Sequence, residues 1–347
     1  MNDAQLVVVG AGPIGLACAI EARLSGLDVL VIEPRTGPID KACGEGLMPG
    51  ALAALHRIGV DPHGMRLEGI AYVDREARVE HRFAERPGRG VRRTVLHQAL
   101  ADRAGELGTR VARAHVTAVA QRHDDVTLGL SDGSTLTAPW VIAADGLHSP
   151  VRRLLGLDGR AQPRPRRRFG VRRHYDIAPW TGLVEVHWSP VAEAYVTPVD
   201  DHTVGVAVLG SRPLDQEGVI RAIPELASRL EGVPAVTELR GAGPLLQRAR
   251  GRTCGRVLLA GDASGYVDAL TGEGLRVGFA QARSAVAAVR AGNTEQYERA
   301  WRTTTRDFRM LTSALVIAAR SRYRSRIVPT AVKRPELFGS VVERLSH

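Results

Sequence analysis

The chain of 347 residues has only three cysteines, Cys18, Cys43 and Cys254, and none forms a CxxC pair. An odd number of cysteines without metal or disulfide spacing favours a reducing compartment, so we predict a cytoplasmic protein without structural disulfides. No apolar run is long enough to span a bilayer, the stretch Leu311 to Ala319 included. The apolar run at residues 6–9 leads straight into a glycine turn, which is not the pattern of a signal peptide.

Lysine is almost absent, and Lys41 and Lys333 are its only two occurrences. The net charge of +10 is therefore carried by arginine, and aromatic residues make up only 4% of the chain. The densest arginine cluster, Arg164 to Arg173, has little aromatic interleaving and no nucleic-acid-binding motif, so we expect no nucleic-acid partner. An anionic cofactor or an anionic membrane surface fits this charge better.

The last segment, residues 293–347, contains a basic stretch beside apolar residues. Two interpretations stay open for it: a solvated helix face, or a peripheral membrane contact that would make a cytoplasmic protein membrane-associated. The arginines concerned are Arg320, Arg322, Arg324 and Arg326.

What the chain does contain is a dinucleotide fingerprint at its start. An apolar strand over residues 5–10 runs into Gly10-Ala11-Gly12-Pro13-Ile14-Gly15, then a helix over 14–24 and a strand over 28–32 that ends at Glu33. Gly10 makes the tight turn, Gly12 lets the backbone approach a pyrophosphate, and Gly15 lets the helix pack against the strand. Glu33 is placed to accept the ribose hydroxyls.

Two further buried strands end in an aspartate beside a glycine, at Asp145-Gly146 and at Gly261-Asp262. An open parallel sheet binds ligands at the carboxyl ends of its strands, so these loops and the glycine turn should converge on one long ligand. Flavin adenine dinucleotide is long enough to need all three. We expect Asp262 to accept a ribityl hydroxyl, and the helix that begins near Gly272 to face the flavin ring.

The loop from residue 39 to residue 49 holds three candidate functional side chains. Lys41 provides a compact, titratable ammonium or is a solvated surface residue, and the sequence does not decide between the two. Cys43 is a reactive thiol or a small packing residue. Glu45 lies between two glycines before a helix, as in a loop pressed against a ligand.

The remaining pattern predicts an α/β fold in which a Rossmann-like domain of the glutathione-reductase type is interrupted by an antiparallel-sheet substrate domain and followed by C-terminal helices. We expect a strand pair over 67–85, an antiparallel meander over 110–138, and a second sheet between 155 and 255 with a helix over 216–230 and a strand over 237–239. The predicted limits are 1–66, 88–154 and 255–292 for the cofactor domain, 67–87 and 155–254 for the substrate domain, and 293–347 for two or three helices.

Several ordered motifs resemble the glutathione-reductase-type flavoproteins, and more closely the para-hydroxybenzoate hydroxylase group with its geranylgeranyl reductase branch. The resemblance spans roughly residues 5 to 300. The motifs are GAGPIG with Glu33, Arg93-x-x-Leu96-x-x-x-Leu100, Ala144-Asp145-Gly146-x-x-Ser149-x-Val151-Arg152, and the stretch 261–275. Those most like the reductase branch are Cys43-Gly44-Glu45-Gly46 and Tyr195-Val196-Thr197-Pro198.

The resemblance implies bound FAD, with Arg93 against the cofactor and Asp145-Gly146 near both FAD and a transient NADPH or NADH. The flavin itself would carry the catalysis, and we expect no metal because the histidines lack ligand spacing. Weak catalytic candidates are Lys41, Cys43, Glu45, His187 and Tyr195. The candidate cofactor-binding residues are Gly10, Gly12, Pro13, Ile14, Gly15, Glu33, Pro34, Arg35, Ala42, Cys43, Gly44, Arg93, Val116, Asp145, Gly146, Gly261, Asp262, Gly272, Gly274 and Leu275.

Two departures from the hydroxylase pattern lie in the stretch 261–275. Gly265 stands where hydroxylases commonly carry histidine, and Ala269, with Asp268 beside it, replaces a usual proline. These two differences change the polarity of the flavin-side loop relative to the hydroxylase pattern. The Trp-x-Trp-x-Ile signature of the group's halogenases is absent, which argues against halogenation.

Three functions remain. The favoured hypothesis is an NAD(P)H-dependent monooxygenase that hydroxylates an aromatic or polyketide-like substrate with O2 through a flavin C4a-hydroperoxide. The motifs at Cys43 and Tyr195 favour the alternative, an ene-reductase that saturates prenyl double bonds in a lipid-like substrate. A non-catalytic FAD-binding protein is the third.

Overall fold

The computed structural model describes residues 3–75, 77–163 and 167–346. Its first layer is a six-stranded sheet of order β18-β19-β12-β1-β2-β8, in which all neighbours are parallel except β18 and β19. The strands are β1 (Leu6–Val9), β2 (Val29–Ile32), β8 (Arg110–Ala112), β12 (Trp140–Ala143), β18 (Thr253–Cys254) and β19 (Val257–Leu259). Since β1, β12 and β19 are neighbours, the three loops that follow them meet at one edge, which confirms the predicted Rossmann-like fold.

Both faces of this sheet are covered, as its continuous apolar strands require. Leu6 and Val8 pack into the core on the side of α1 (Pro13–Leu24), α3 (Arg93–Glu106) and α7 (Gly274–Ala291). Val7 and Val9 face the other side, where a meander packs. Its strands are β9 (Val116–Gln121), β10 (Val126–Leu130) and β11 (Thr135–Ala138).

The meander is shorter than predicted. Residues 110–121 do not form one strand: β8 extends the parallel sheet beside β2, and β9 begins only at Val116. The backbone N–H of Glu33 bonds the carbonyl of Ala112 at 3.0 Å, so the parallel edge captures the start of this segment before the chain turns back.

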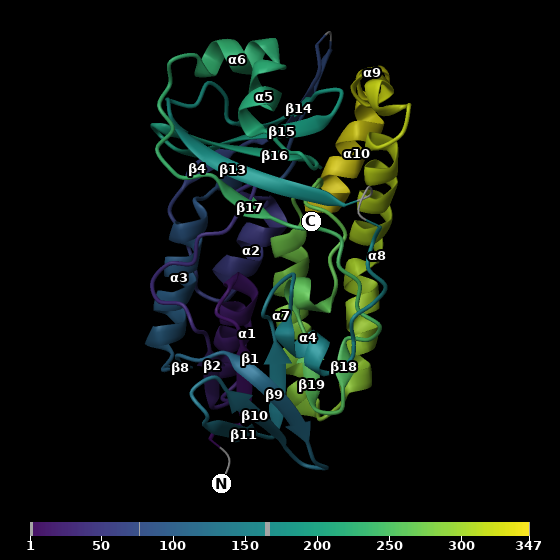
Figure 1. Ribbon diagram of the computed structural model, residues 1–347. Helices are drawn as coiled ribbons and strands as arrows, with labels where there is room; N and C mark the ends of the chain where they lie inside the picture. The colour runs from purple at the N-terminus through teal and green to yellow at the C-terminus, as the bar shows by residue number, and fades with distance from the viewer. Residues whose placement is uncertain (1–2, 76, 164–166, 347) are drawn as a thin grey trace.

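The second layer is a seven-stranded sheet of order β17-β13-β16-β15-β14-β5-β6 (Figure 1). It is antiparallel except between β14 and β5, and it unites two segments far apart in sequence. This membership supports the assignment of 67–87 and 155–254 to one domain, whose limits remain our proposal. Its strands are β5 (Gly69–Val73), β6 (Arg78–Arg82), β13 (Arg168–Asp176), β14 (Leu183–Trp188), β15 (Ala192–Asp200), β16 (Thr203–Ser211) and β17 (Arg240–Ala242).

Two predictions in this layer were wrong in detail. The helix predicted over 216–230 is two helices, α5 (Gln216–Arg221) and α6 (Pro224–Leu230), because Pro224 has no N–H to continue the first. The strand predicted over 237–239 lies at β17 instead. The hydroxyl of Thr237 accepts the His174 backbone N–H, so the ladder with β13 begins only at Arg240.

A small sheet of β3 (Gly46–Leu47), β7 (Gly88–Gly90) and β4 (Met65–Leu67) joins the two layers. The helix α2 (Pro49–Arg57) packs against this small sheet, whereas α4 (Pro150–Leu154) packs against β9. The C-terminal segment forms three helices, α8 (Thr294–Ala319), α9 (Ile327–Lys333) and α10 (Pro335–Ser346). Figure 1 shows α8 running along the side of the molecule from β18 toward the seven-stranded sheet, where α9 and α10 lie. None of the helices described has the length and apolar character needed to cross a bilayer.

Candidate cofactor and substrate site

One large cavity, of about 1240 Å³, extends from the carboxyl edge of the parallel sheet to the seven-stranded sheet and the C-terminal helices. Its polar end is formed by the loops after β1, β12 and β19, and its other end by apolar side chains of β14–β16 and of α8–α10. The cavity therefore joins a dinucleotide-type cradle to an apolar chamber.

The glycine turn after β1 has the geometry expected of a phosphate cradle. Gly10 has φ +99°, and a Cβ on Gly15 would lie 1.8 Å from the Gly10 carbonyl oxygen, so both positions exclude a side chain. A Cβ on Gly12 would meet no atom within 4 Å, because Gly12 faces the cavity. Gly12 also caps α1 without a side-chain partner, which leaves the first N–H groups of the helix for an anion.

The acidic residue of the fingerprint lies beside the cavity but does not line it. Glu33 is 1% exposed, and its Oε2 accepts the Ala11 backbone N–H at 2.9 Å while Oε1 accepts Arg35 Nε at 2.6 Å. The pKa of Glu33 is lowered because these hydrogen bonds outweigh the opposing effect of burial. Arg35, and not Glu33, lines the cavity. Three other predicted cofactor residues also lie outside the cavity lining: Gly15, Pro34 and Val116.

Two buried polar atoms at the cradle lack a hydrogen-bond partner within the described residues. Arg93 Nε and Asp145 Oδ1 are buried without a hydrogen bond. Burial raises the pKa of Asp145 and also that of Asp262, the aspartate after β19. Lys41 reaches the same region, since a Cβ on Gly146 would lie 3.4 Å from its Nζ. Desolvation, followed by repulsion from Arg35 and Arg93, lowers the pKa of Lys41.

Unpaired buried donors and acceptors are costly, so these groups point to a ligand that carries phosphates and hydroxyls. The cavity location of Lys41 favours the first of the two interpretations that the sequence left open. The predicted cofactor residues that line the cavity are Gly10, Gly12, Pro13, Ile14, Arg35, Ala42, Cys43, Gly44, Arg93, Asp145, Gly146, Gly261, Asp262, Gly272, Gly274 and Leu275.

The other catalytic candidates divide between the cavity and the core. Cys43 lines the cavity, and its Sγ accepts the Glu45 N–H at 3.4 Å. Tyr195 lines it too and donates its hydroxyl to the Leu270 carbonyl at 2.7 Å. His187 does not line it: its ring is buried 3.2 Å from Glu185 within the seven-stranded sheet.

The flavin-side loop carries no unbalanced charge at Asp268. Its carboxylate is buried 2.9 Å from Arg168 Nε, and Arg168 also binds Glu193 at 2.6 Å. Glu193 in turn pairs with Arg324 at 2.5 Å, so that arginine points inward and does not belong to a basic surface. Within the cluster Arg164 to Arg173, Arg168 and Arg172 are likewise buried and Arg167 and Arg173 are partly buried, while residues 164–166 lie outside the described residues.

Sequence reasoning missed the roles of Arg172 and of the C-terminal helices. Along β13, Arg168, Gly170, Arg172 and His174 are buried while the residues between them are partly exposed. The two-residue period places those side chains on one face, but hydropathy alone would turn Phe169 and Val171 inward instead, so the sequence could not show which face is buried. The side chains from α8–α10 carry no signal of cavity contact, because that contact depends on how the last helices fold back.

The chain belongs to the FAD binding domain family, whose model matches residues 3–296. This confirms the resemblance to the para-hydroxybenzoate hydroxylase group and the expectation of FAD. The unpartnered polar groups and the open Gly12 position fit that cofactor.

Individual relatives span reductases and hydroxylases. The menaquinone reductase of Mycolicibacterium smegmatis is 30% identical over 86% of this chain and 80% of its own length. That of Mycobacterium tuberculosis is 38% identical over 45% of this chain and only 40% of its own length. The solved structure of OxyS anhydrotetracycline hydroxylase from Streptomyces rimosus is 25% identical, with a TM-score of 0.76 over 99% of this chain and 75% of that chain.

Glu273, at the start of α7, should make stability depend on pH. Burial raises its pKa from 4.5 to about 7, against the opposing effect of Arg276 at 2.5 Å. Between these two values the folded state holds a proton that the unfolded state releases, so Glu273 lowers stability as pH rises through this window. We expect the apoprotein to lose about 3 kcal/mol from this group, a loss that Glu273→Gln should remove. Urea denaturation at several pH values checks this, and parallel curves for the two proteins would contradict it.

Proposed function

We propose that the protein is an NAD(P)H-dependent FAD monooxygenase that hydroxylates an aromatic ring carrying a long apolar chain. The observation that carries this proposal is the continuity of the cavity: the cofactor cradle opens directly into an apolar chamber. An aromatic head beside the flavin would leave its chain among apolar side chains, which gain free energy by burying it.

FAD would be held at the polar end by residues of all three loops. The turn from Gly10 to Gly15 and the start of α1 suit the pyrophosphate, with Lys41 and Arg93 as cations near it. Asp262 would accept a ribityl hydroxyl, and the start of α7 at Gly274 would face the ring. FAD supplies the electron transfer and the activation of O2; the protein supplies position and charge.

The substrate end of the cavity is lined mainly by apolar side chains. Tyr72, Val184, Val186, Tyr195 and Leu209 come from the seven-stranded sheet. The facing wall comes from the C-terminal helices, and its aliphatic and phenylalanine members are Leu311, Leu315, Ala318, Ile327, Ala331, Leu337, Phe338, Val341, Val342 and Leu345. Phe338 contacts Tyr72 with ring centroids 4.9 Å apart, which fixes α10 against the sheet.

The second candidate is reduction of a double bond in the apolar chain. The match to the menaquinone reductase of M. smegmatis over most of both chains favours it, because menaquinone also joins a ring to a long apolar chain. Cys43 in the cavity wall is a candidate proton donor for that reaction.

Labelled oxygen separates the two reactions. The FAD-loaded protein is supplied with NADPH or NADH, oxygen-18 gas and two probes, an alkylphenol and a polyprenyl quinone. The masses of the products are measured by mass spectrometry. Hydroxylation adds one heavy oxygen atom to the phenol. Addition of two hydrogens to the quinone's chain without label would refute the monooxygenase and establish the reductase, whereas FAD binding without turnover of either probe would favour a non-catalytic protein.

Exposed apolar and basic side chains lie on the C-terminal helices that line the chamber, and we propose that this surface docks on an anionic membrane. Ile317 is 70% exposed, Leu337 61% and Met310 56%. Tyr323, Arg326, Arg334 and Leu337 are exposed and also line the cavity, so they mark its mouth. A lipid-like substrate could therefore enter from the bilayer.

This surface should bind vesicles. We expect sedimentation with phosphatidylglycerol-containing vesicles, weakened by salt, and about a tenfold loss of affinity in Ile317→Ser combined with Leu337→Ser. The control is Leu24→Ser combined with Val111→Ser, two exposed apolar residues of α1 and β8, 47% and 43% exposed. Equal binding by both double variants would contradict the assignment.

A further inference from the structure

Glu45 has a backbone conformation that its side chain makes costly. Its φ is +60°, and no other described non-glycine residue has a positive φ. A residue with a Cβ pays roughly 1–2 kcal/mol for this conformation, whereas glycine would adopt it freely. Since Gly44 and Gly46 flank it, a third glycine would make the same turn at lower cost. The side chain of Glu45 therefore needs a physical reason.

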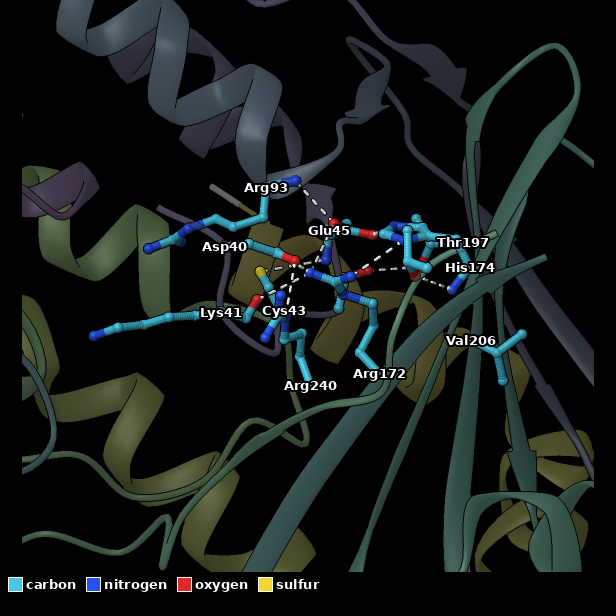
Figure 2. Close-up of polar contacts among 12 residues, drawn as sticks. Asp40, Lys41, Cys43, Glu45, Arg93, Arg172, His174, Thr197, Val206 and Arg240 are labelled. Atoms are coloured by element: carbon cyan, nitrogen blue, oxygen red, sulfur yellow. Dashed lines mark hydrogen bonds and ion pairs between the residues drawn. The ribbon is translucent and has the colours of Figure 1, made fainter. Parts of the chain in front are cut away.

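That reason lies in the contacts of the carboxylate, which is buried between three elements. Oε1 accepts the backbone N–H of Arg93 at 2.8 Å, and Oε2 lies 2.6 Å from Nε2 of His174 (Figure 2). The facing strand leaves room for it only through Gly205, on which a Cβ would come within 2.9 Å of Oε2. The residue itself is 3% exposed.

The hydrogen bonds fix the tautomer of His174. Its Nδ1 lies 3.1 Å from a guanidinium nitrogen of Arg172, which can only donate. Nδ1 therefore accepts, and Nε2 carries the proton that is donated to Glu45. Asp40 pairs with Arg172 and, at 3.4 Å, with Arg240. Arg172 therefore lies between two carboxylates, that of Asp40 and, at 3.7 Å, that of Glu45.

The same contacts connect the seven-stranded sheet to groups that face the cofactor. Glu45 closes the loop that carries Lys41 and Cys43 into the cavity. Its carboxylate also supplies the anion at the start of α3, where the N-cap Arg92 makes no side-chain cap, and this start carries Arg93. In Figure 2 the side chains of Lys41 and Arg93 both extend away from His174, on the opposite side of the carboxylate.

We propose that Glu45 and His174 are positioning residues. Through their hydrogen bond, the seven-stranded sheet holds Lys41, Cys43 and Arg93 against FAD. The proposal rests on FAD occupying the cavity, as in the proposed function. It assigns to Glu45 no proton transfer, and it explains why a strained glutamate stands between two glycines.

Four variants separate the carboxylate from the backbone turn. Glu45→Gly keeps the turn and relieves its strain, and Glu45→Gln keeps the size but offers one acceptor to two donors. His174→Gln keeps a donor toward Glu45, and His174→Leu removes it. The control is Glu185→Gln, a second buried carboxylate beside a histidine of the same sheet, outside the cavity lining.

The readouts are the FAD dissociation constant from fluorescence quenching, the visible absorption of bound flavin, and Tm. We expect Glu45→Gly, Glu45→Gln and His174→Leu to weaken FAD binding at least about tenfold and to shift the flavin spectrum, with His174→Gln close to wild type. Glu185→Gln should lower Tm without either change.

Wild-type FAD affinity and spectrum in Glu45→Gly and His174→Leu would overturn the proposal. An equal loss of affinity in Glu185→Gln would also overturn it, because the effect would then be general destabilisation. Failure of the wild-type protein to bind FAD at all would instead overturn the proposed function, so the two failures are distinguishable.

Discussion

Replacing Gly12 with alanine should weaken FAD binding at least about 100-fold and leave the folded apoprotein intact. A Cβ at this position meets no protein atom within 4 Å, and the backbone φ of −65° suits alanine. The added methyl group would occupy the space through which the turn approaches the pyrophosphate. Titration of the apoprotein with FAD measures the affinity, and urea denaturation measures the stability of the apoprotein.

Alanine substitutions at two other glycines serve as controls for the Gly12→Ala variant. Gly15→Ala would press a Cβ against the Gly10 carbonyl oxygen at 1.8 Å, so it should destabilise the apoprotein as well, by about 1–3 kcal/mol or more. Gly105→Ala, in α3 with open space around it, should change FAD affinity not at all. If Gly12→Ala bound FAD as wild type does, the turn would not be the pyrophosphate site.

Filling the apolar chamber should select against long substrates. Ala318 lies on α8 and lines the cavity, so Ala318→Trp places an indole where the substrate chain would lie. If the indole displaces about four methylene groups at ~0.8 kcal/mol each, kcat/KM for a long-chain alkylphenol should fall about 200-fold. Phenols with no chain should react almost unchanged, because their ring stays near the flavin.

The matched control for this variant is Ala314→Trp. Ala314 lies one turn earlier on α8, is exposed, and does not line the cavity. It should leave the kinetics of both substrates unchanged. An equal loss for short and long phenols in Ala318→Trp would mean that the indole disturbs the cofactor end, and the chamber would not be the chain site.

The cofactor half of this molecule could be predicted because its signals are local. Gly10, Gly12 and Gly15 each serve a backbone need within one turn, and Asp145 and Asp262 each follow a buried strand. Glu33 shows what the spacing of a sequence motif does not predict, namely the contacts of a side chain. The spacing placed it correctly after β2, but its carboxylate binds the backbone of the turn and Arg35, a detail that depends on side-chain geometry.

The substrate half depends on contacts between distant residues. His174 and Glu45 are 129 positions apart, and no spacing rule brings them together. His187 and His174 occupy similar strand positions in sequence, yet one pairs with Glu185 in the sheet and the other with the cofactor loop. Arg324 belonged by pattern to a basic surface, but the buried Glu193 draws it inward. In each of these examples, a contact with a carboxylate, distant in sequence or on the same strand, sets the orientation of the side chain.

The measurement that tests the central claim most directly is kcat/KM for a series of phenols with alkyl chains of increasing length, under NADPH or NADH and O2. If the aromatic ring reacts beside FAD while the chain fills the apolar chamber, kcat/KM should rise about fourfold for each added methylene and level off when the chamber is full. Values that stay flat, or fall from the first methylene onward, would contradict the assignment of the chamber to the substrate chain.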